Sequence, residues 1–186
     1  MKVTLPTSDK DITLDQFIKT KEITSRENLT ELEKEKRVFL LFTGLKYKQL
    51  KNIPVTQYNE VIDIIKNGIS NKAEHQKTFV FKGVKYGMIP NFDKITGGEF
   101  LDLSEYENDD ENLHKLMAVL YREVDKEDAF GNYSIKPYNG TEERAELFKE
   151  LPWNIVSGTL FFFESLANQL EIYTLKSLQA ERPKEA

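Results

Sequence analysis

Two histidines are the first candidates for acid–base chemistry or metal binding in this sequence of 186 residues. His75 and His114 lie far apart along the chain, and neither belongs to a His-Glu-x-x-His motif, which places two zinc ligands on one helix face. No serine lies in a Gly-x-Ser-x-Gly motif, no glycine-rich loop precedes a Lys-Ser or Lys-Thr pair, and cysteine is absent. We therefore predict that the protein is not an enzyme and has no catalytic residue, cofactor or metal ion. The alternative is a small nucleotide- or metal-dependent enzyme.

The segment Gly97-Gly98-Glu99-Phe100 also invites a catalytic interpretation. It resembles the Gly-Gly-acid-acid-Phe hairpin of diguanylate cyclases, but it has one acidic residue where that family has two, and too few predicted strands flank it. The other interpretation is that the glycines form a turn and that Glu99 lies in the first turn of a helix capped by Thr96. We favour this structural interpretation, on which a Glu99→Ala variant is expected to fold nearly as well as the wild type.

The charge distribution argues against two kinds of ligand. The chain has 26 Lys and Arg against 31 Asp and Glu, a net charge of −5, so it lacks the basic balance expected of a nucleic-acid-binding protein. The run 105–111 is strongly acidic, but it does not follow the ligand pattern of an EF-hand calcium loop. We predict a solvated loop whose carboxylates Asp109, Asp110 and Glu111 lie at the start of a helix.

Apolar residues recur at positions i, i+3 and i+4 along most of the chain, which predicts amphipathic helices. Threonine, proline and glycine at the ends of these segments are typical of helix caps. The predicted helices begin after Thr13 with Leu14, Phe17 and Ile18, and continue at about 28–42, 54–71, 113–122, 141–151 and 153–179.

Three segments have the composition of strands. Residues 2–6 alternate polar and apolar, and the β-rich runs 78–81 and 84–88 are separated by Lys82-Gly83, which predicts a two-residue hairpin. Residues 131–137 are predicted to form a short strand or an extended connection. The predicted fold is α+β, a mainly α-helical single domain with a small antiparallel β-hairpin. It covers residues 1–180, with 1–72 and 73–180 as candidate lobes and 181–186 as a frayed tail.

The last predicted helix is apolar on nearly every side around Phe161, Phe162 and Phe163. Consecutive residues of a helix are ~100° apart, so these three side chains cannot share one face. Either this helix is the centre of the core, or part of its surface docks a partner helix or a second copy of the chain. For the second interpretation we select these partner-binding residues: Leu113, Met117, Leu120, Phe161, Phe162, Leu166 and Leu170.

Four segments of the sequence share a pattern with a group of bacteriophage proteins. They are DITLDQF at 11–17, VFLLFTG at 38–44, GMIPNFDKITGGEFLDL at 87–103 and LHKLMAVLYR at 113–122. Over about residues 11–170 the chain resembles small proteins from the virion and tail morphogenesis regions of tailed bacteriophages. The resemblance includes no catalytic motif, and it implies a role in assembly.

The resemblance implies either a tail-assembly chaperone that keeps a tape-measure protein in solution, or a component of the head-to-tail connection such as a ring. The implied partners are phage structural proteins, of the tape-measure or of the connector and portal region, and further copies of the chain. Nucleic acid is not an expected partner, because of the charge balance given above. A membrane is not expected either, since the start lacks a signal-peptide pattern and the apolar run 155–170 is too polar to span a bilayer. We expect the protein in the host cytoplasm during assembly, and in the virion if it is a structural component.

Overall fold

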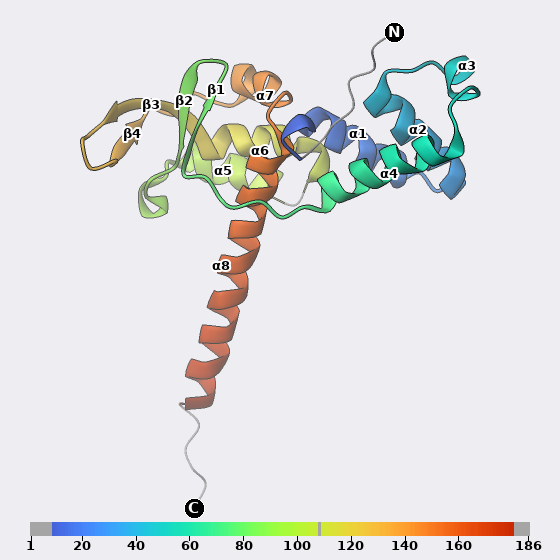
Figure 1. Cartoon of the computed structure of the whole chain (residues 1–186). Helices are drawn as coiled ribbons and strands as arrows, with labels where there is room; N and C mark the ends of the chain where they lie inside the picture. The colour runs from blue at the N-terminus through green and yellow to red at the C-terminus, as the bar shows by residue number, and fades with distance from the viewer. Residues whose placement is uncertain (1–8, 108, 181–186) are drawn as a thin grey trace, which may run out of the picture.

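The computed structural model describes the backbone of residues 9–107 and 109–180, and the side chains of these residues from 10 to 166. Within this part of the chain, eight α-helices accompany a four-stranded antiparallel sheet, which confirms the prediction of a mainly helical α+β fold. The strand predicted at 2–6 and the tail at 181–186 lie outside the described residues. Figure 1 shows the first four helices at one end, the sheet at the other, and the last helix projecting away from both.

The first four helices form one end of the molecule. They are α1 (Leu14–Thr24), α2 (Glu31–Thr43), α3 (Tyr47–Leu50) and α4 (Val55–Ser70). Thr13 and Thr30 begin α1 and α2 through capping boxes. At Thr13 the hydroxyl accepts the Gln16 N–H at 3.2 Å, while the Gln16 side chain accepts the Thr13 N–H at 3.0 Å. Gly44 ends α2 in the left-handed conformation, with φ of 64°.

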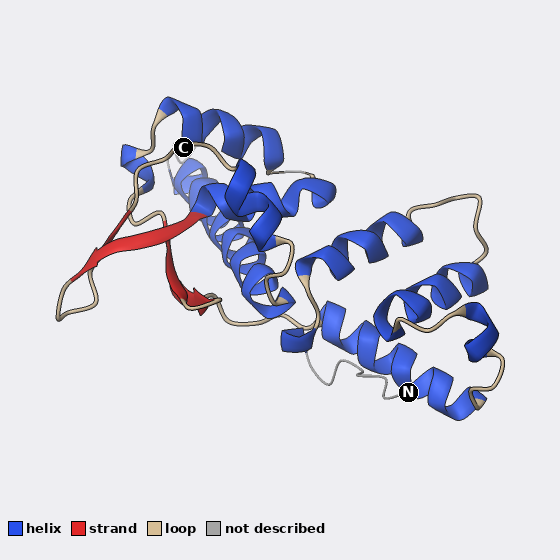
Figure 2. Cartoon of the chain, turned by 90° about the horizontal axis from the view of Figure 1, so that it is seen from above, coloured by secondary structure: helices blue, strands red, loops and turns tan. Residues whose placement is uncertain are grey.

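Every neighbouring pair of strands is antiparallel. The strands are β1 (Thr78–Phe81), β2 (Val84–Met88), β3 (Tyr121–Glu127) and β4 (Tyr133–Ile135), in the order β1-β2-β3-β4. The predicted hairpin of β1 and β2 is confirmed, because Lys82 and Gly83 form its turn with φ of 47° and 81°, as a type I′ turn requires. β4 confirms the strand expected within 131–137. Figure 2 shows the sheet, in red, extending away from the first helices.

The remaining helices are α5 (Gly97–Tyr106), α6 (Leu113–Leu120), α7 (Glu142–Phe148) and α8 (Trp153–Ala180). The prediction that α6 would continue through Arg122 is wrong, since it ends at Leu120 and β3 begins at the next residue. The last carbonyl groups of a helix need partners outside it. Arg144 donates two hydrogen bonds, of 3.2 and 3.1 Å, to the Ala118 carbonyl, and the Ile89 N–H donates to the Leu120 carbonyl at 2.9 Å. These partners support the direct change from helix to strand.

α7 differs in detail from its prediction. Thr141 occupies the N-cap position, as predicted, but its side chain makes no capping hydrogen bond. The helix also ends at Phe148, earlier than the predicted end at residue 151. α8 follows almost at once, and its bounds agree with the helix predicted at 153–179.

The N-terminal segment is joined to the start of α8. In an isolated antiparallel bridge, the Leu14 N–H donates to the Leu151 carbonyl at 2.9 Å and the Trp153 N–H donates to the Ile12 carbonyl at 2.7 Å. The rings of Phe17 and Trp153 stack with their centroids 3.6 Å apart. One cluster of buried apolar side chains therefore runs through both candidate lobes.

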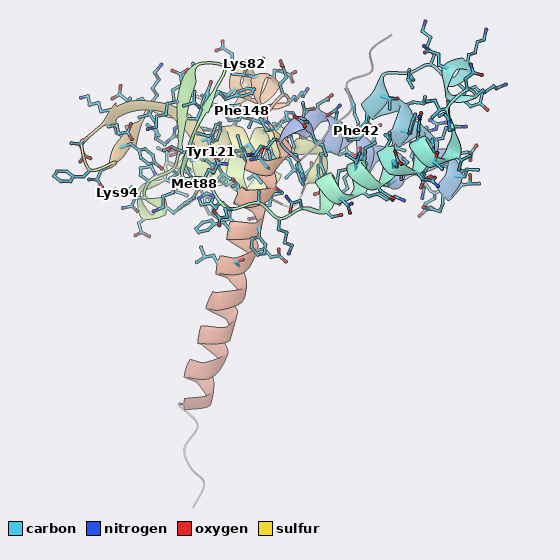
Figure 3. The ribbon with its side chains drawn as sticks, in the orientation of Figure 1. Phe42, Lys82, Met88, Lys94, Tyr121 and Phe148 are labelled. Atoms are coloured by element: carbon cyan, nitrogen blue, oxygen red, sulfur yellow. The ribbon has the colours of Figure 1, made fainter. Side chains whose placement is uncertain are left out.

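The core beside the sheet is built from aromatic side chains. Tyr121 and Phe148 are fully buried, and the Phe148 ring meets Tyr86 edge-on at 5.0 Å. The hydroxyl groups of Tyr121 and Thr159 are hydrogen-bonded at 2.9 Å, so this buried polar pair is satisfied. Figure 3 shows Tyr121 and Phe148 in this body and Phe42 among the first helices.

α8 begins as a buried helix and is crossed closely by the segment that precedes β1. Val156 and Thr159 are fully buried. A Cβ atom at Gly158 would lie 2.5 Å from the backbone oxygen of Glu74, so only glycine allows the two backbones to approach this closely. The first turns of α8 are therefore a core helix, whereas its later turns leave the body (Figure 1).

Candidate functional site

Glu99 of the Gly-Gly-Glu-Phe segment and Arg122, at the end of the run 113–122, meet in a buried ion pair. Glu99, in the first turn of α5, and Arg122, in β3, are 3% and 7% exposed, and the guanidinium of Arg122 donates a hydrogen bond to the Glu99 carboxylate. The other carboxylate oxygen of Glu99 accepts the Thr96 N–H at 2.6 Å, while the Thr96 hydroxyl accepts the Glu99 N–H at 3.2 Å. The predicted helix start is confirmed, and Glu99 also fastens α5 to the sheet.

The surroundings of Glu99 act on its pKa in opposite directions. Burial raises this pKa, but the hydrogen bonds from Thr96 and the ion pair with Arg122 outweigh it and hold the pKa below its usual value. Glu99 is therefore ionised at neutral pH and bonded through both oxygens, an arrangement that suits a structural carboxylate better than a general acid or base. The expectation that a Glu99→Ala variant folds normally is reversed, because that variant leaves Arg122 buried without its partner.

A cleft of about 1080 Å³ opens beside the ion pair, between α5, α6, β3 and α7. The Arg122 guanidinium lies over the Tyr138 ring, 5.4 Å from its centroid. The Tyr138 hydroxyl donates to the Asp102 carboxylate, and Lys136 pairs with Glu123. These charged and polar groups satisfy one another only in part, because two buried nitrogens of residues that line the cleft, Arg122 Nε and His114 Nδ1, have no hydrogen-bond partner among the described residues.

The two histidines lie in separate places. His114 is 7% exposed at the cleft, whereas His75 is half-buried and stacks on Phe162, with ring centroids 4.4 Å apart. Burial lowers the pKa of each histidine, and nearby lysines act in the same direction. Among residues 10–107 and 109–166, whose side chains the structure describes, there is no group of three or more acidic or histidine side chains that could hold a metal ion.

The residues selected for partner binding fall into different environments. Leu113, Met117 and Leu120 are 3%, 0% and 2% exposed, because the sheet and the neighbouring helices bury them in the core. In the folded chain they cannot line a groove for a partner, and this part of the selection is corrected. The side chain of Leu170 lies outside the described residues.

The other selected residues lie where α8 leaves the body. Phe161 and Leu166 are 40% and 41% exposed, and Phe162 is half-buried. The ammonium group of Lys72 lies 4.5 Å from the Phe161 ring centroid. The helix then continues away from the body (Figure 1). We call residues 160–180 the α8 arm, a projecting helix with exposed apolar side chains at its base.

Arg122 and Arg144, which line the cleft, and Tyr138, which contacts Arg122, were not predicted as a group. They come from a strand, a connection and a helix that no spacing rule relates, and the tertiary structure brings them together. One available signal was the arginine that directly follows the apolar run 116–121. Such a charge beside a core helix must find a partner.

Comparisons with models of known protein families, with curated proteins and with solved structures found no match. Among the helices of the described residues, none has both the length and the apolar composition needed to cross a membrane. A functional assignment therefore depends on the geometry of the chain and on the resemblance in its sequence.

Proposed function

We propose that this chain is a non-enzymatic bacteriophage assembly protein that acts through protein–protein contacts, as a tail-assembly protein of the tape-measure chaperone type. The observation that carries this proposal is the α8 arm, which presents Phe161 and Leu166 beside a charged body. A chaperone for a long helical protein needs apolar surface to cover the apolar stripe of its client. The resemblance to phage morphogenesis proteins supports a tape-measure protein as the client.

The base of the arm has the composition of a helix-binding surface. Aromatic side chains supply large contact areas at a small entropic cost. Phe163 also contacts Phe92 edge-on, with centroids 5.9 Å apart, and Phe92 is itself 38% exposed. Lys72 and Glu164 form an ion pair at 3.5 Å that provides a polar border to this surface. Apolar contact area with a polar rim is typical of a protein interface.

The test is co-expression with the tape-measure protein encoded in the same phage genome. A variant that combines Phe161→Asp with Leu166→Asp should lose the ability to keep the tape-measure protein in solution, because charges replace the exposed apolar contacts. Val55 on α4 is 73% exposed, so Val55→Asp is the matched control and should retain full activity. Equal protection by the arm variant and the control would refute a client site at the base of the arm.

A component of the head-to-tail connection is the second candidate, and a different observation favours it. The molecule has unlike ends, a helical one and a sheet-containing one (Figures 1 and 2), and a closed ring of identical subunits needs two unlike surfaces. Mass spectrometry of purified virions separates the two candidates. A stoichiometric copy number in the particle would establish the ring component, whereas absence from the particle is expected of the chaperone.

A further inference from the structure

The cleft beside the ion pair of Glu99 and Arg122 contains one edge of a guanidinium that the described chain leaves without a partner. Arg122 lines this cleft and is 7% exposed. Among the described residues it donates through Nη1 alone, to Glu99, and its buried Nε has no hydrogen-bond partner. The Nε and Nη2 atoms of an arginine form one edge, whose two parallel N–H groups match the two oxygens of a carboxylate. A carboxylate at this edge leaves the bond to Glu99 in place.

A second guanidinium lies near the first. Arg144 of α7 also lines the cleft, and its hydrogen bonds go to neutral oxygens, those of two backbone carbonyls and one side-chain amide. Burial lowers the pKa of Arg144, and the positive charge of Arg122 lowers it further. Among the described residues, Glu99 is the one carboxylate that forms an ion pair with either arginine. Because a partly buried charge needs a partner, one positive charge of the cleft remains without an anion.

Five acidic residues also line the cleft, but none of them pairs with the two arginines. Two of them, Glu142 and Glu143, are exposed in the first turn of α7, where the helix dipole stabilises them. The other three have partners of their own: Asp102 with Tyr138, Glu123 with Lys136, and Glu146 with Lys149. The exposed border of the cleft is therefore negative, which favours a singly charged anion over one of higher charge.

The size of the cleft suits an organic molecule. Its volume of about 1080 Å³ lies at the upper end of the range of small-ligand sites. Tyr106 and Pro137 contribute apolar surface to the lining. The buried Nδ1 of His114, which lines the same cleft, also has no hydrogen-bond partner among the described residues. A ligand with an anionic group and an uncharged body can therefore use both kinds of surface.

We propose that this cleft binds a small organic carboxylate, whose oxygens accept the N–H groups of Arg122 and whose charge balances that of Arg144. The body of the ligand lies against the apolar lining at Tyr106. This activity goes beyond contacts between proteins. It does not depend on a phage role, because the purified chain and a small molecule are sufficient to test it.

Titration with benzoate, followed by NMR on the arginine side chains, is the first measurement. In the isotope-labelled full chain, the Nε–H resonances of Arg122 and Arg144 should shift and saturate with a dissociation constant of roughly a few millimolar, as expected of a ligand of this size. Arg26 and Arg37 are exposed and lie outside the cleft, so their resonances are internal controls. Benzamide has nearly the same shape without the charge, and it should bind at least about tenfold more weakly.

Two conservative variants locate the contact. Arg122→Lys keeps a charge beside Glu99 but loses the guanidinium edge, and Arg144→Lys makes the same change in α7. Each should weaken benzoate binding by about tenfold, whereas Arg37→Lys should bind like the wild type. The backbone spectrum shows whether each variant is folded, and the comparison of benzoate with benzamide needs no variant at all.

Four results would overturn the proposal. They are binding of benzamide as tight as that of benzoate, shifts at Arg26 and Arg37 as large as those in the cleft, full affinity in both Arg122→Lys and Arg144→Lys, and no saturable shift in the wild type. Inorganic phosphate is the remaining probe. If phosphate binds more tightly than benzoate, the cleft selects a tetrahedral anion, and the assignment to a carboxylate is wrong.

Discussion

Replacement of Glu99 by glutamine separates the two tasks of this side chain. Glutamine can still accept the Thr96 N–H, because both Glu and Gln serve at this position of a capping box. It cannot neutralise Arg122, whose side chain is 8% exposed. Removing one partner of a buried pair costs about 3–5 kcal/mol, since the other charge remains buried and uncompensated. For a chain of this length, a loss of about 3 kcal/mol lowers the melting temperature by about 6–12 °C.

Urea denaturation followed by circular dichroism measures this loss, and two further variants assign it. Thr96→Ala removes the cap but not the ion pair, so it should cost only about 1 kcal/mol. The double variant of Glu99→Gln with Arg122→Met should lose less than the sum of the single variants, because neither charge is then left alone. If Glu99→Gln costs no more than Thr96→Ala, or if the double variant is simply additive, the ion pair does not fasten α5 to the sheet.

Three other results are expected. Gly158→Ala should destabilise the chain by about 1–3 kcal/mol, because its Cβ would press on the Glu74 carbonyl oxygen at 2.5 Å; an unchanged urea midpoint would contradict this close approach. Tyr121→Phe should cost about 1–3 kcal/mol in the same assay, because it removes the buried hydroxyl that bonds to Thr159 at 2.9 Å and donates to the Gln76 carbonyl at 2.8 Å, and a neutral effect would show that these bonds are unimportant. Burial lowers the pKa of His114 in the folded chain. As the pH falls below about 6.5, the unfolded chain therefore binds a proton first, and the stability present at neutral pH is lost. His114→Gln should show a smaller loss of melting temperature between about pH 7.5 and 5.5 than the wild type.

Local signals in the sequence account for much of the fold. Threonine caps, glycine stops and apolar spacing were sufficient for α1, α2, α4 and α5, and the Lys82-Gly83 pair was sufficient for the first hairpin. β3 was missed because the apolar run of α6 reaches Leu120 without a glycine or proline, so nothing local marks the change to a strand. The partners that end this helix, Arg144 and Ile89, are known only from the tertiary structure.

The candidate surfaces were harder to predict for the same reason. Hydrophobic spacing identified the core-facing residues of α6 correctly, but it cannot distinguish a face that the chain itself buries from one that a partner buries. Leu113, Met117 and Leu120 were therefore selected with Phe161 and Leu166, although only the last two are exposed. Phe130, which is 91% exposed in the turn between β3 and β4, produced no signal, because a single aromatic residue in a polar turn has no period.

The bridge between the N-terminal segment and the start of α8 has a consequence for synthesis on the ribosome. Ile12 and Leu14 leave the ribosome early, but their backbone partners Trp153 and Leu151 follow only after most of the chain has been made. Closing so long a loop is entropically costly and slows folding. The helical end must therefore wait for the beginning of α8 before its core is complete. The α8 arm is the last part of the described chain to emerge from the ribosome. The exposed apolar side chains at its base therefore become accessible to other proteins only when the body completes its folding.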